Sequence, residues 1–221
     1  MTSHTIFVTG ATGFVGRNLI PELLKRGHTV RSLARVGSES KVPAGCTIVC
    51  GDPLNKSTFE DQITPADTFI QLVGVARPSP AKAKEFRTID LQSARESVAA
   101  AAAAGVSHFI YISVAQPAPI MKAYIEARAE AEALIRSASF RGATILRPWY
   151  VLGPGRQWPR LLRPIYWVLE RLPSKRDTAR RLGLLTYQQM TRALVASVED
   201  PAEGIRILSV PAIKTAAQDL N

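Results

Sequence analysis

Tyr124 and Arg128 stand four residues apart in the stretch KAYIEARAEAE, which has the composition of a helix. Residues four apart share one helix face, so the phenol and the guanidinium are expected to be neighbours. A phenol has a pKa of about 10 and works as an acid or base near neutral pH only with help from its surroundings. Arg128 would favour the phenolate by charge, although its bulkier, forked head is not equivalent to a lysine. The pair therefore predicts a proton-transfer site or, alternatively, a tyrosine that only packs or contacts a bound nucleotide.

The most specific motif is VTGATGFVG, which places Gly10, Gly13 and Gly16 between an expected strand and an expected helix. Gly10 permits a tight turn, Gly13 lets backbone approach a pyrophosphate, and Gly16 lets the helix pack closely on the sheet. The helix N-terminus offers free N–H groups and the positive end of its dipole to phosphates. In this context the glycines predict a dinucleotide-binding loop rather than a purely structural turn.

The elements that must position these residues alternate between strand and helix. Apolar runs predict seven strands, at 5–10, 29–35, 46–52, 68–76, 108–114, 143–151 and 206–210. Helical spacing follows the first strand, where Pro21 should kink or loosen one turn, and recurs at about 89–104 and 122–136. Repeated strand–helix units predict an α/β fold with a doubly wound parallel sheet, which binds ligands beyond the carboxyl ends of its strands.

These motifs resemble the short-chain dehydrogenase/reductase superfamily in its atypical and extended branches. The closest likeness is to the complex I accessory-subunit-like and NmrA-like group. The resemblance covers about residues 5–155 and rests on the glycine spacing and on GD at 51–52, LVG at 72–74, AAGVSHFIYIS, YIEARAEAE and LRPWYVLGPG. It implies an NAD(P)-binding Rossmann domain and an oxidoreductase activity.

The resemblance also implies roles for single residues. Tyr124 would be the general acid or base on a carbonyl or alcohol oxygen, Arg128 would hold the nicotinamide ribose, and Ser113 would bind the same substrate oxygen. The sequence departs from the family pattern by having Arg128 where a lysine is usual. Val114 and Ala115 also stand where many members have Ser or Thr. These departures leave nucleotide binding intact as an expectation and put turnover in question.

Cofactor contacts follow from the same resemblance. Asp52 would contact the adenine amino group, or it would only cap the segment after Pro53. The expected cofactor residues are Gly10, Thr12, Gly13, Phe14, Val15, Arg35, Asp52, Leu72, Val73 and Gly74.

The segment RSLARVGSES after the second expected strand bears on the choice of nucleotide. NAD-specific proteins usually have a carboxylate there, whereas Arg35, with Ser38 nearby and Lys41 beyond, suits the 2′-phosphate of NADP(H). Glu39, a nearby carboxylate, favours NAD(H) instead. The alternative for Arg35 is that it only caps the end of the strand in solvent. NADP(H) is therefore favoured over NAD(H).

The C-terminal third carries much of the positive charge. Residues 156–181 contain eight Arg or Lys and two acids, interleaved with Trp158, Tyr166 and Trp167, within a chain of net charge +10. A solvated basic lid, an anionic small-molecule substrate and a peripheral membrane contact are the interpretations left open. Nucleic acid is disfavoured because no known binding module accompanies the charge.

Composition sets the remaining expectations. The length of 221 residues, 46% of them hydrophobic, suits one well-cored domain. The N-terminus has no signal-peptide pattern, and no apolar run is long enough to span a membrane. Cys46 and Cys50 are predicted to be buried, reduced thiols on one strand face. These features favour a cytoplasmic protein, with contact at the inner face of a membrane left open.

The sequence thus predicts a single NAD(P)-binding Rossmann domain over 1–221, with 153–190 as a small basic cap on the substrate side. The favoured function is an NADP(H)-dependent oxidoreductase acting on a small carbonyl or quinone-type substrate. The alternative is a non-catalytic redox sensor or assembly factor that binds the nucleotide. The oligomeric state and the substrate stay open.

Overall fold

Seven parallel strands form the central sheet of the computed structural model, which describes residues 2–117, 121–153 and 182–220. Their order is β3-β2-β1-β4-β5-β6-β9, as the doubly wound prediction requires. The order reverses between β1 and β4, where such sheets open a crevice at their carboxyl edge. The bounds are β1 Thr5–Thr9, β2 Thr29–Ala34, β3 Thr47–Cys50, β4 Thr68–Gln71, β5 His108–Ile112, β6 Gly142–Arg147 and β9 Gly204–Ser209.

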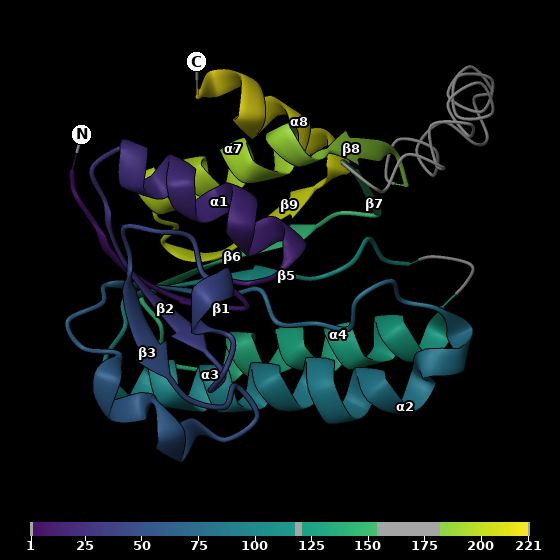
Figure 1. Ribbon diagram of the computed structural model, residues 1–221. Coiled ribbons are helices and arrows are strands. Elements are labelled where there is room, and N and C mark those ends of the chain that lie inside the picture. Colours follow the sequence, from purple (N-terminus) through teal and green to yellow (C-terminus); the bar gives the residue numbers. More distant parts are fainter. Residues whose placement is uncertain (1, 118–120, 154–181, 221) are drawn as a thin grey trace.

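Helices cover both faces of the sheet (Figure 1). One face carries α1 (Phe14–Lys25), α7 (Tyr187–Glu199) and α8 (Val210–Asp219). The other carries α3 (Gln92–Ala103) and α4 (Lys122–Ser137). A short helix α2 (Ala83–Glu85) and a π-helical segment η5 (Phe86–Leu91) lead into α3, so the predicted helix starts earlier and in an irregular form. Pro21 lies inside α1, which continues past it.

The core has two parts because successive strand side chains point to opposite faces. On β1, Ile6 and Val8 face the layer of α1 and α7, while Phe7 faces the layer of α3 and α4. Phe69 stacks between Phe7 and Phe109, with ring centroids 5.3 Å from each. Strands buried on both faces need near-continuous apolar runs, which is why these segments were recognisable in the sequence.

Two expected strands, at 143–151 and 68–76, end four or five residues earlier than predicted. The segment 143–151 splits at Pro148, since proline has no N–H for the ladder. Its second half becomes β7 (Tyr150–Leu152), which pairs with β8 (Leu184–Thr186) in a separate two-stranded sheet. The segment 68–76 leaves the sheet after Gln71 and becomes a loop.

The prediction that both cysteines are buried was wrong. Cys50 is exposed and Cys46 is half-buried and precedes β3, although both are free thiols. The reason is that β3 is the edge strand of the sheet and is uncovered on one side. Its apolar run resembled a central strand, yet Ile48 is 43% exposed.

The predicted cap over 153–190 falls mainly on 154–181, which lie outside the described residues. The basic aromatic segment 156–181 lies there entirely. Of the rest, β8 and the start of α7 are described, and Thr186 caps α7 through the backbone N–H of Gln189. Within the described ranges, no helix has the length and apolar character needed to cross a membrane.

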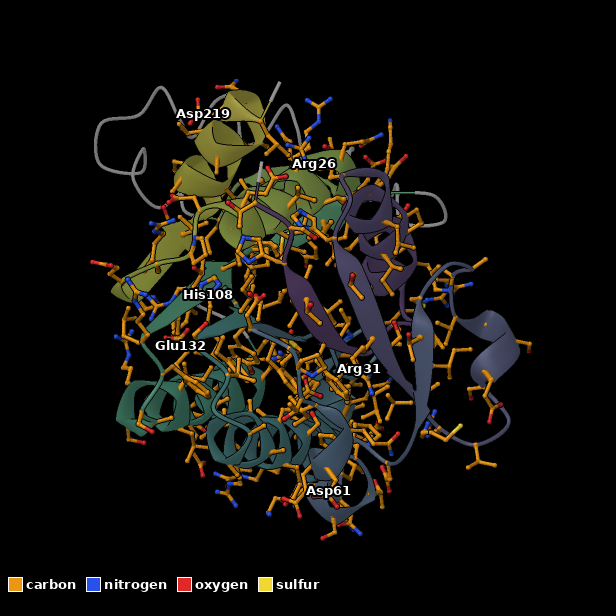
Figure 2. The ribbon with its side chains drawn as sticks, turned by 90° about the vertical axis from the view of Figure 1, so that its left-hand side faces the viewer. Arg26, Arg31, Asp61, His108, Glu132 and Asp219 are labelled. Carbon is orange, nitrogen blue, oxygen red and sulfur yellow. The ribbon has the colours of Figure 1, made fainter. Side chains whose placement is uncertain are left out.

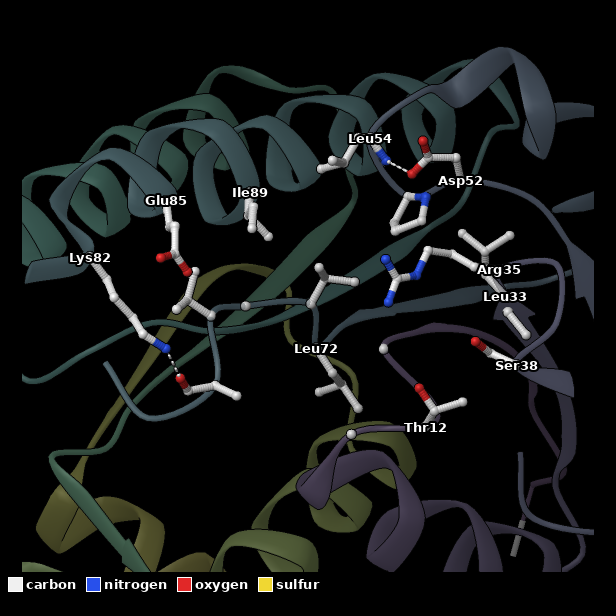
Figure 3. A pocket seen from close by; sticks show the side chains of 18 residues that line it. Thr12, Leu33, Arg35, Ser38, Asp52, Leu54, Leu72, Lys82, Glu85 and Ile89 are labelled. Carbon is white, nitrogen blue, oxygen red and sulfur yellow. Dashed lines mark hydrogen bonds between the residues drawn. The ribbon is translucent and has the colours of Figure 1, made fainter. Parts of the chain in front are cut away.

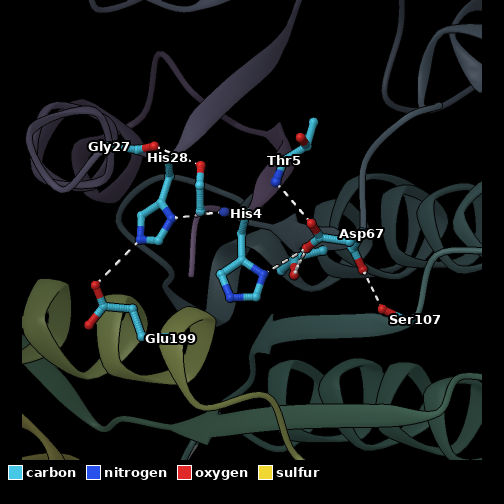
Figure 4. Close-up of polar contacts among 9 residues, drawn as sticks. His4, Thr5, Gly27, His28, Asp67, Ser107 and Glu199 are labelled. Carbon is cyan, nitrogen blue, oxygen red and sulfur yellow. Dashed lines mark hydrogen bonds and ion pairs between the residues drawn. The ribbon is translucent and has the colours of Figure 1, made fainter. Parts of the chain in front are cut away.

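Polar side chains tie the amino-terminal edge of the sheet together, opposite the crevice (Figure 4). The carboxylate of Asp67 accepts from the backbone N–H of Thr5 at 2.9 Å and lies 3.1 Å from Nδ1 of His4. His28 accepts from the backbone N–H of His4, and its Nε2 lies 3.4 Å from Glu199 on α7. This network joins β1, β2, β4 and α7 away from the candidate site.

His108 is a buried histidine at the start of β5. Figure 2 places it at the level of the sheet, between the two helical layers. Its Nε2 lies 3.0 Å from the hydroxyl of Thr144, and its Nδ1 has no partner in the described structure. Burial, with the positive charge of Arg206, lowers the pKa of His108 to about 4 from a usual 6.5.

We predict that His108 makes the protein less stable in mild acid. Between the folded and unfolded pKa values the unfolded chain binds more protons, so the free energy of unfolding falls as pH falls. The loss attributable to His108 between about pH 7.5 and about pH 5 is about 2 kcal/mol. Urea unfolding at both pH values measures it, and H108Q should show a correspondingly smaller loss. An equal loss in the variant would contradict the assignment.

Candidate functional site

A cavity of about 420 Å³ opens at the carboxyl edge of the sheet, at the point where strand order reverses (Figure 3). Its volume falls within the range of small-molecule sites. The loops after β1, β2, β3 and β4 supply most of its wall. The described lining residues are Gly10, Thr12, Gly13, Leu33, Ala34, Arg35, Ser38, Asp52, Pro53, Leu54, Leu72, Val73, Gly74, Val75, Ala76, Lys82, Glu85 and Ile89.

Each glycine of the loop occupies a position where a larger residue would be unsuitable, for a different reason in each case. Gly10 has φ +77°, and a Cβ there would lie 2.7 Å from the carbonyl carbon of Leu72. A Cβ on Gly16 would lie 2.6 Å from the carbonyl oxygens of Gly10 and Ala11. Gly13 is the N-cap of α1 and has no capping side chain, so the helix N-terminus stays open toward the cavity. This arrangement fits a phosphate group.

One end of the cavity contains a guanidinium group. Arg35 at the end of β2 and Ser38 both line it, and Figure 3 shows the Arg35 guanidinium directed inward. Asp52 lines the same end, and its Oδ1 accepts from the backbone N–H of Leu54 at 3.0 Å. Asp52 therefore has the capping contact that the sequence left as an alternative and is also placed at the cavity. The carboxylate of Glu39 accepts from the Cys50 thiol at 3.6 Å.

The floor of the cavity is the loop after β4, and side chains hold it at two points. Oε1 of Gln71 accepts from the backbone N–H of Val73 at 2.6 Å. Oδ2 of Asp90, which lies in η5, accepts from the backbone N–H of Val75 at 2.9 Å. Gln71 in turn donates to Ser93 at 2.9 Å. The floor is thus tied to the start of the helix beneath it.

Arg128 lies under this floor in a buried polar cluster. Its Nη2 forms an ion pair with Asp90, and the two side chains are 7% and 0% exposed. Its Nη1 donates to the carbonyl oxygen of Ile112 at 2.7 Å and to the hydroxyl of Tyr111 at 3.2 Å. Burial alone would lower the pKa of Arg128, but Tyr111, Tyr124 and Asp90 together raise it. The guanidinium is a permanent buried cation.

Tyr124 lies on the same helix face as Arg128, as predicted. The Arg128 guanidinium carbon is 5.1 Å from the Tyr124 ring centroid, within the range of a cation–π contact. The ring also packs on Phe86 of η5, with centroids 4.9 Å apart. The second phenol near Arg128, Tyr111, is fully buried, and burial raises its pKa to about 12. Tyr124 is the partly accessible phenol of the two.

Ser113, at the end of β5, uses its hydroxyl inside the protein. It donates to Oε1 of Glu132 at 2.6 Å, and Gln116 donates to the same oxygen at 2.8 Å. Arg147 binds both carboxylate oxygens of Glu132. Burial would raise the pKa of Glu132, but Arg147 and Ser113 lower it overall. The hydroxyl of Ser113 is therefore part of a buried hydrogen-bond network rather than directed at the cavity.

The structure gathers eight of the ten expected cofactor residues around the cavity. Phe14 and Val15 are not among the described lining residues: Phe14 packs beside Tyr187 with centroids 6.2 Å apart, and Val15 packs on the core. Tyr124, Arg128 and Ser113 are likewise absent from the described lining. Asp90, Lys82 and Glu85 were not predicted from the sequence, because no motif gives a signal for them.

Comparison with known proteins identifies the family. The NAD(P)H-binding family matches residues 10–158, which is more than half of the chain. The chain belongs to this family. The matched stretch includes Gly10, Gly13 and Gly16 of the VTGATGFVG motif, and the likeness to the extended and atypical short-chain dehydrogenase/reductases is confirmed.

Several relatives of the chain carry the names of oxidoreductases or of a subunit of one. The chain is 34% identical to a 3-beta-hydroxysteroid dehydrogenase of Mycolicibacterium neoaurum over 112 residues, which cover 48% of the chain and 31% of the relative. It is 27% identical to a ceramide reductase of Caulobacter vibrioides, covering 92% and 64%. The NADH-ubiquinone oxidoreductase 40 kDa subunit of Neurospora crassa is 29% identical, covering 68% and 41%. The chain thus spans about a third to two thirds of the length of these relatives.

A solved structure supports the fold. The Bordetella bronchiseptica enzyme WbmH in complex with NAD+ superimposes with a TM-score of 0.69 at 17% identity, covering 94% of this chain and 76% of that one. At this identity the likeness concerns the fold alone.

We predict that Gly10 tolerates a side chain less well than a glycine that has the same left-handed backbone but open space around it. G10A should lose about 1–2 kcal/mol from the left-handed backbone and about 1–3 kcal/mol more from the contact with Leu72. Gly27 is a matched control, because it has φ +83° and nothing within 4 Å of an added Cβ. Urea unfolding of G10A and G27A compares them. Equal losses would mean that the close approach at Leu72 relaxes without cost.

Proposed function

We propose that the protein is an NADP(H)-dependent oxidoreductase acting on a small carbonyl or quinone-type substrate. The observation that carries the proposal is the continuous cavity that joins the glycine loop, the Arg35 end and the β4 floor. Its described wall includes an uncapped helix N-terminus for a pyrophosphate and a guanidinium beside Ser38 for a 2′-phosphate. We take 1–221 as one domain, with 153–190 as its cap on the substrate side.

In the proposed reaction, the cofactor and the protein each supply one of the two groups that reduce a carbonyl. The nicotinamide would supply a hydride to the carbonyl carbon, and the chain would supply the proton. In the proposal, the hydroxyl of Tyr124 gives that proton to the carbonyl oxygen, and Arg128, whose guanidinium carbon is 5.1 Å from the ring centroid, holds the ring in place. Ser113 would assist at the substrate oxygen, which requires its hydroxyl to turn away from Glu132.

Relatives support carbonyl chemistry. One is a ceramide reductase, and another is a ketoreductase of Stigmatella aurantiaca that is 26% identical over 66% of the chain. The preference for NADP(H) rests on Arg35, since Glu39, the nearby acid, is hydrogen-bonded to Cys50.

A non-catalytic nucleotide-binding protein is the second candidate. It is favoured by the buried state of Arg128, which is paired with Asp90, and by the contact of Ser113 with Glu132. The relative from Neurospora crassa is a subunit of a larger oxidoreductase. Such a protein would be a redox sensor or assembly factor, with peripheral membrane contact through 156–181.

We predict that Arg35 selects the nucleotide. R35A should weaken NADPH binding about tenfold or more, because a charge-assisted contact is lost, and should change NADH binding little. Isothermal titration with both nucleotides measures the two dissociation constants. R31A is a control on the same strand, since Arg31 bonds to the carbonyl of Gln62 and is not among the described lining residues. Equal small effects of R35A on both nucleotides would remove the assignment.

We predict that Y124F separates binding from turnover. Loss of the phenol should lower kcat by about 100-fold or more, because general acid catalysis is removed, while the dissociation constant for NADPH stays within about twofold. The assay follows NADPH absorbance with a panel of quinones, aldehydes and ketones. Turnover unaffected by Y124F would exclude Tyr124 as the acid. NADPH binding by the natural protein without turnover of any panel member would favour the second candidate.

A further inference from the structure

The floor of the cavity depends on a buried acid outside the sequence motifs. Asp90 accepts from the backbone N–H of Val75 with Oδ2 and pairs with Arg128 through Oδ1. Both Val75 and its neighbour Gly74 line the cavity. Removing the cation from a buried ion pair is costly, so the contact between Asp90 and the loop depends on Arg128.

Arg128 has few groups left for a ligand. Nη2 binds Asp90, and Nη1 binds Ile112 and Tyr111, while Nε is buried without a partner in the described structure. A Cβ added to Gly74 would lie 2.5 Å from Nη2 of Arg128 and 3.2 Å from Oδ1 of Asp90. Gly74 therefore lies directly against the ion pair, and neither Asp90 nor Arg128 is among the described lining residues of the cavity.

The same ion pair reaches Tyr124. Asp90 and Phe86 both belong to η5, and Tyr124 packs on Phe86 and on the Arg128 guanidinium. A π-helical turn is uncommon and often lies at functional sites. The ion pair thus lies between two parts of the proposed site, the β4 floor and the phenol.

We propose that Arg128 and Asp90 are positioning residues, which hold the Gly74–Val75 floor and the Tyr124 ring, and that Arg128 does not clamp the ribose. The proposal rests on the proposed function in taking the cavity as the dinucleotide site. In this proposal Arg128 affects the ligand indirectly: it pairs with Asp90, and Asp90 holds the backbone of Val75 at the cavity floor. Positions 90 and 128 should therefore behave as one unit.

The first test measures dinucleotide binding. D90N and R128K should each weaken NADPH and NADH binding by the same factor of about tenfold, since both variants leave Arg35, the residue proposed to distinguish the two nucleotides, unchanged. The double variant should lose much less than the product of the two factors, because one unit is broken once. Arg95 and Glu130 form an exposed ion pair between α3 and α4, so R95K and E130Q are matched controls that should leave both constants unchanged.

The second test needs no ligand. The amide of Val75 should exchange with deuterium at least about tenfold faster in D90N than in E130Q, because its acceptor is weakened. If D90N or R128K fails to fold, G74A tests the same point, since its Cβ should displace the pair. In G74A/R128K the slimmer lysine should restore part of the lost NADPH binding, and any further loss would count against the proposal.

The outcomes separate the two proposals. If no dinucleotide binds the natural protein, the proposed function fails, while exchange at Val75 still tests the positioning role. Faster exchange together with weaker binding of both nucleotides supports the inference. Unchanged exchange at Val75 in both D90N and G74A would overturn it. So would dissociation constants within about twofold of the natural value in D90N, or an R128K variant that binds and turns over better than the natural protein.

Discussion

The close approach of the β1 and β4 backbones is the constraint on which the site depends. The turn after β1 passes so near the end of β4 that a Cβ on Gly10 would meet the carbonyl carbon of Leu72. The two strands flank the point where strand order reverses, so the loops diverge from here and leave the cavity between them. The helix N-terminus at Gly13 and the floor at Val73 are both placed by this approach.

Below the floor of the cavity, the buried charges are paired with each other. Asp90 and Arg128 neutralise each other where water is excluded, and each also satisfies backbone groups, Val75 N–H and the carbonyl of Ile112. Removing one partner of such a pair is costly, because a buried charge then remains without compensation. We therefore expect the ion pair to hold the floor of the cavity rigidly.

The neighbouring network around Glu132 follows the same principle. Ser113, Gln116 and Arg147 converge on one carboxylate and join the carboxyl ends of β5 and β6 to α4. Tyr124, Arg128 and Glu132 are spaced four apart on α4, so one helix face meets both polar clusters. The proposed acid is therefore mounted on an element held by two buried networks.

The sequence by itself determined the seven strands of the central sheet, the helices α1, α3 and α4, the glycine loop and the position of Tyr124 beside Arg128, because these depend on local periodicity and on steric needs within a few residues. It gave no sign of α7, α8 or the β7–β8 pair. Only the tertiary structure decided which side chains pair with each other and which are exposed. Nothing near Asp90 in the chain marks it as the acid for Arg128, 38 residues away, and nothing local indicates that β3 lies at an edge and exposes Cys50. Burial and pairing across the sheet are set only when distant segments meet, so they decide whether an arginine contacts a ligand or the protein interior.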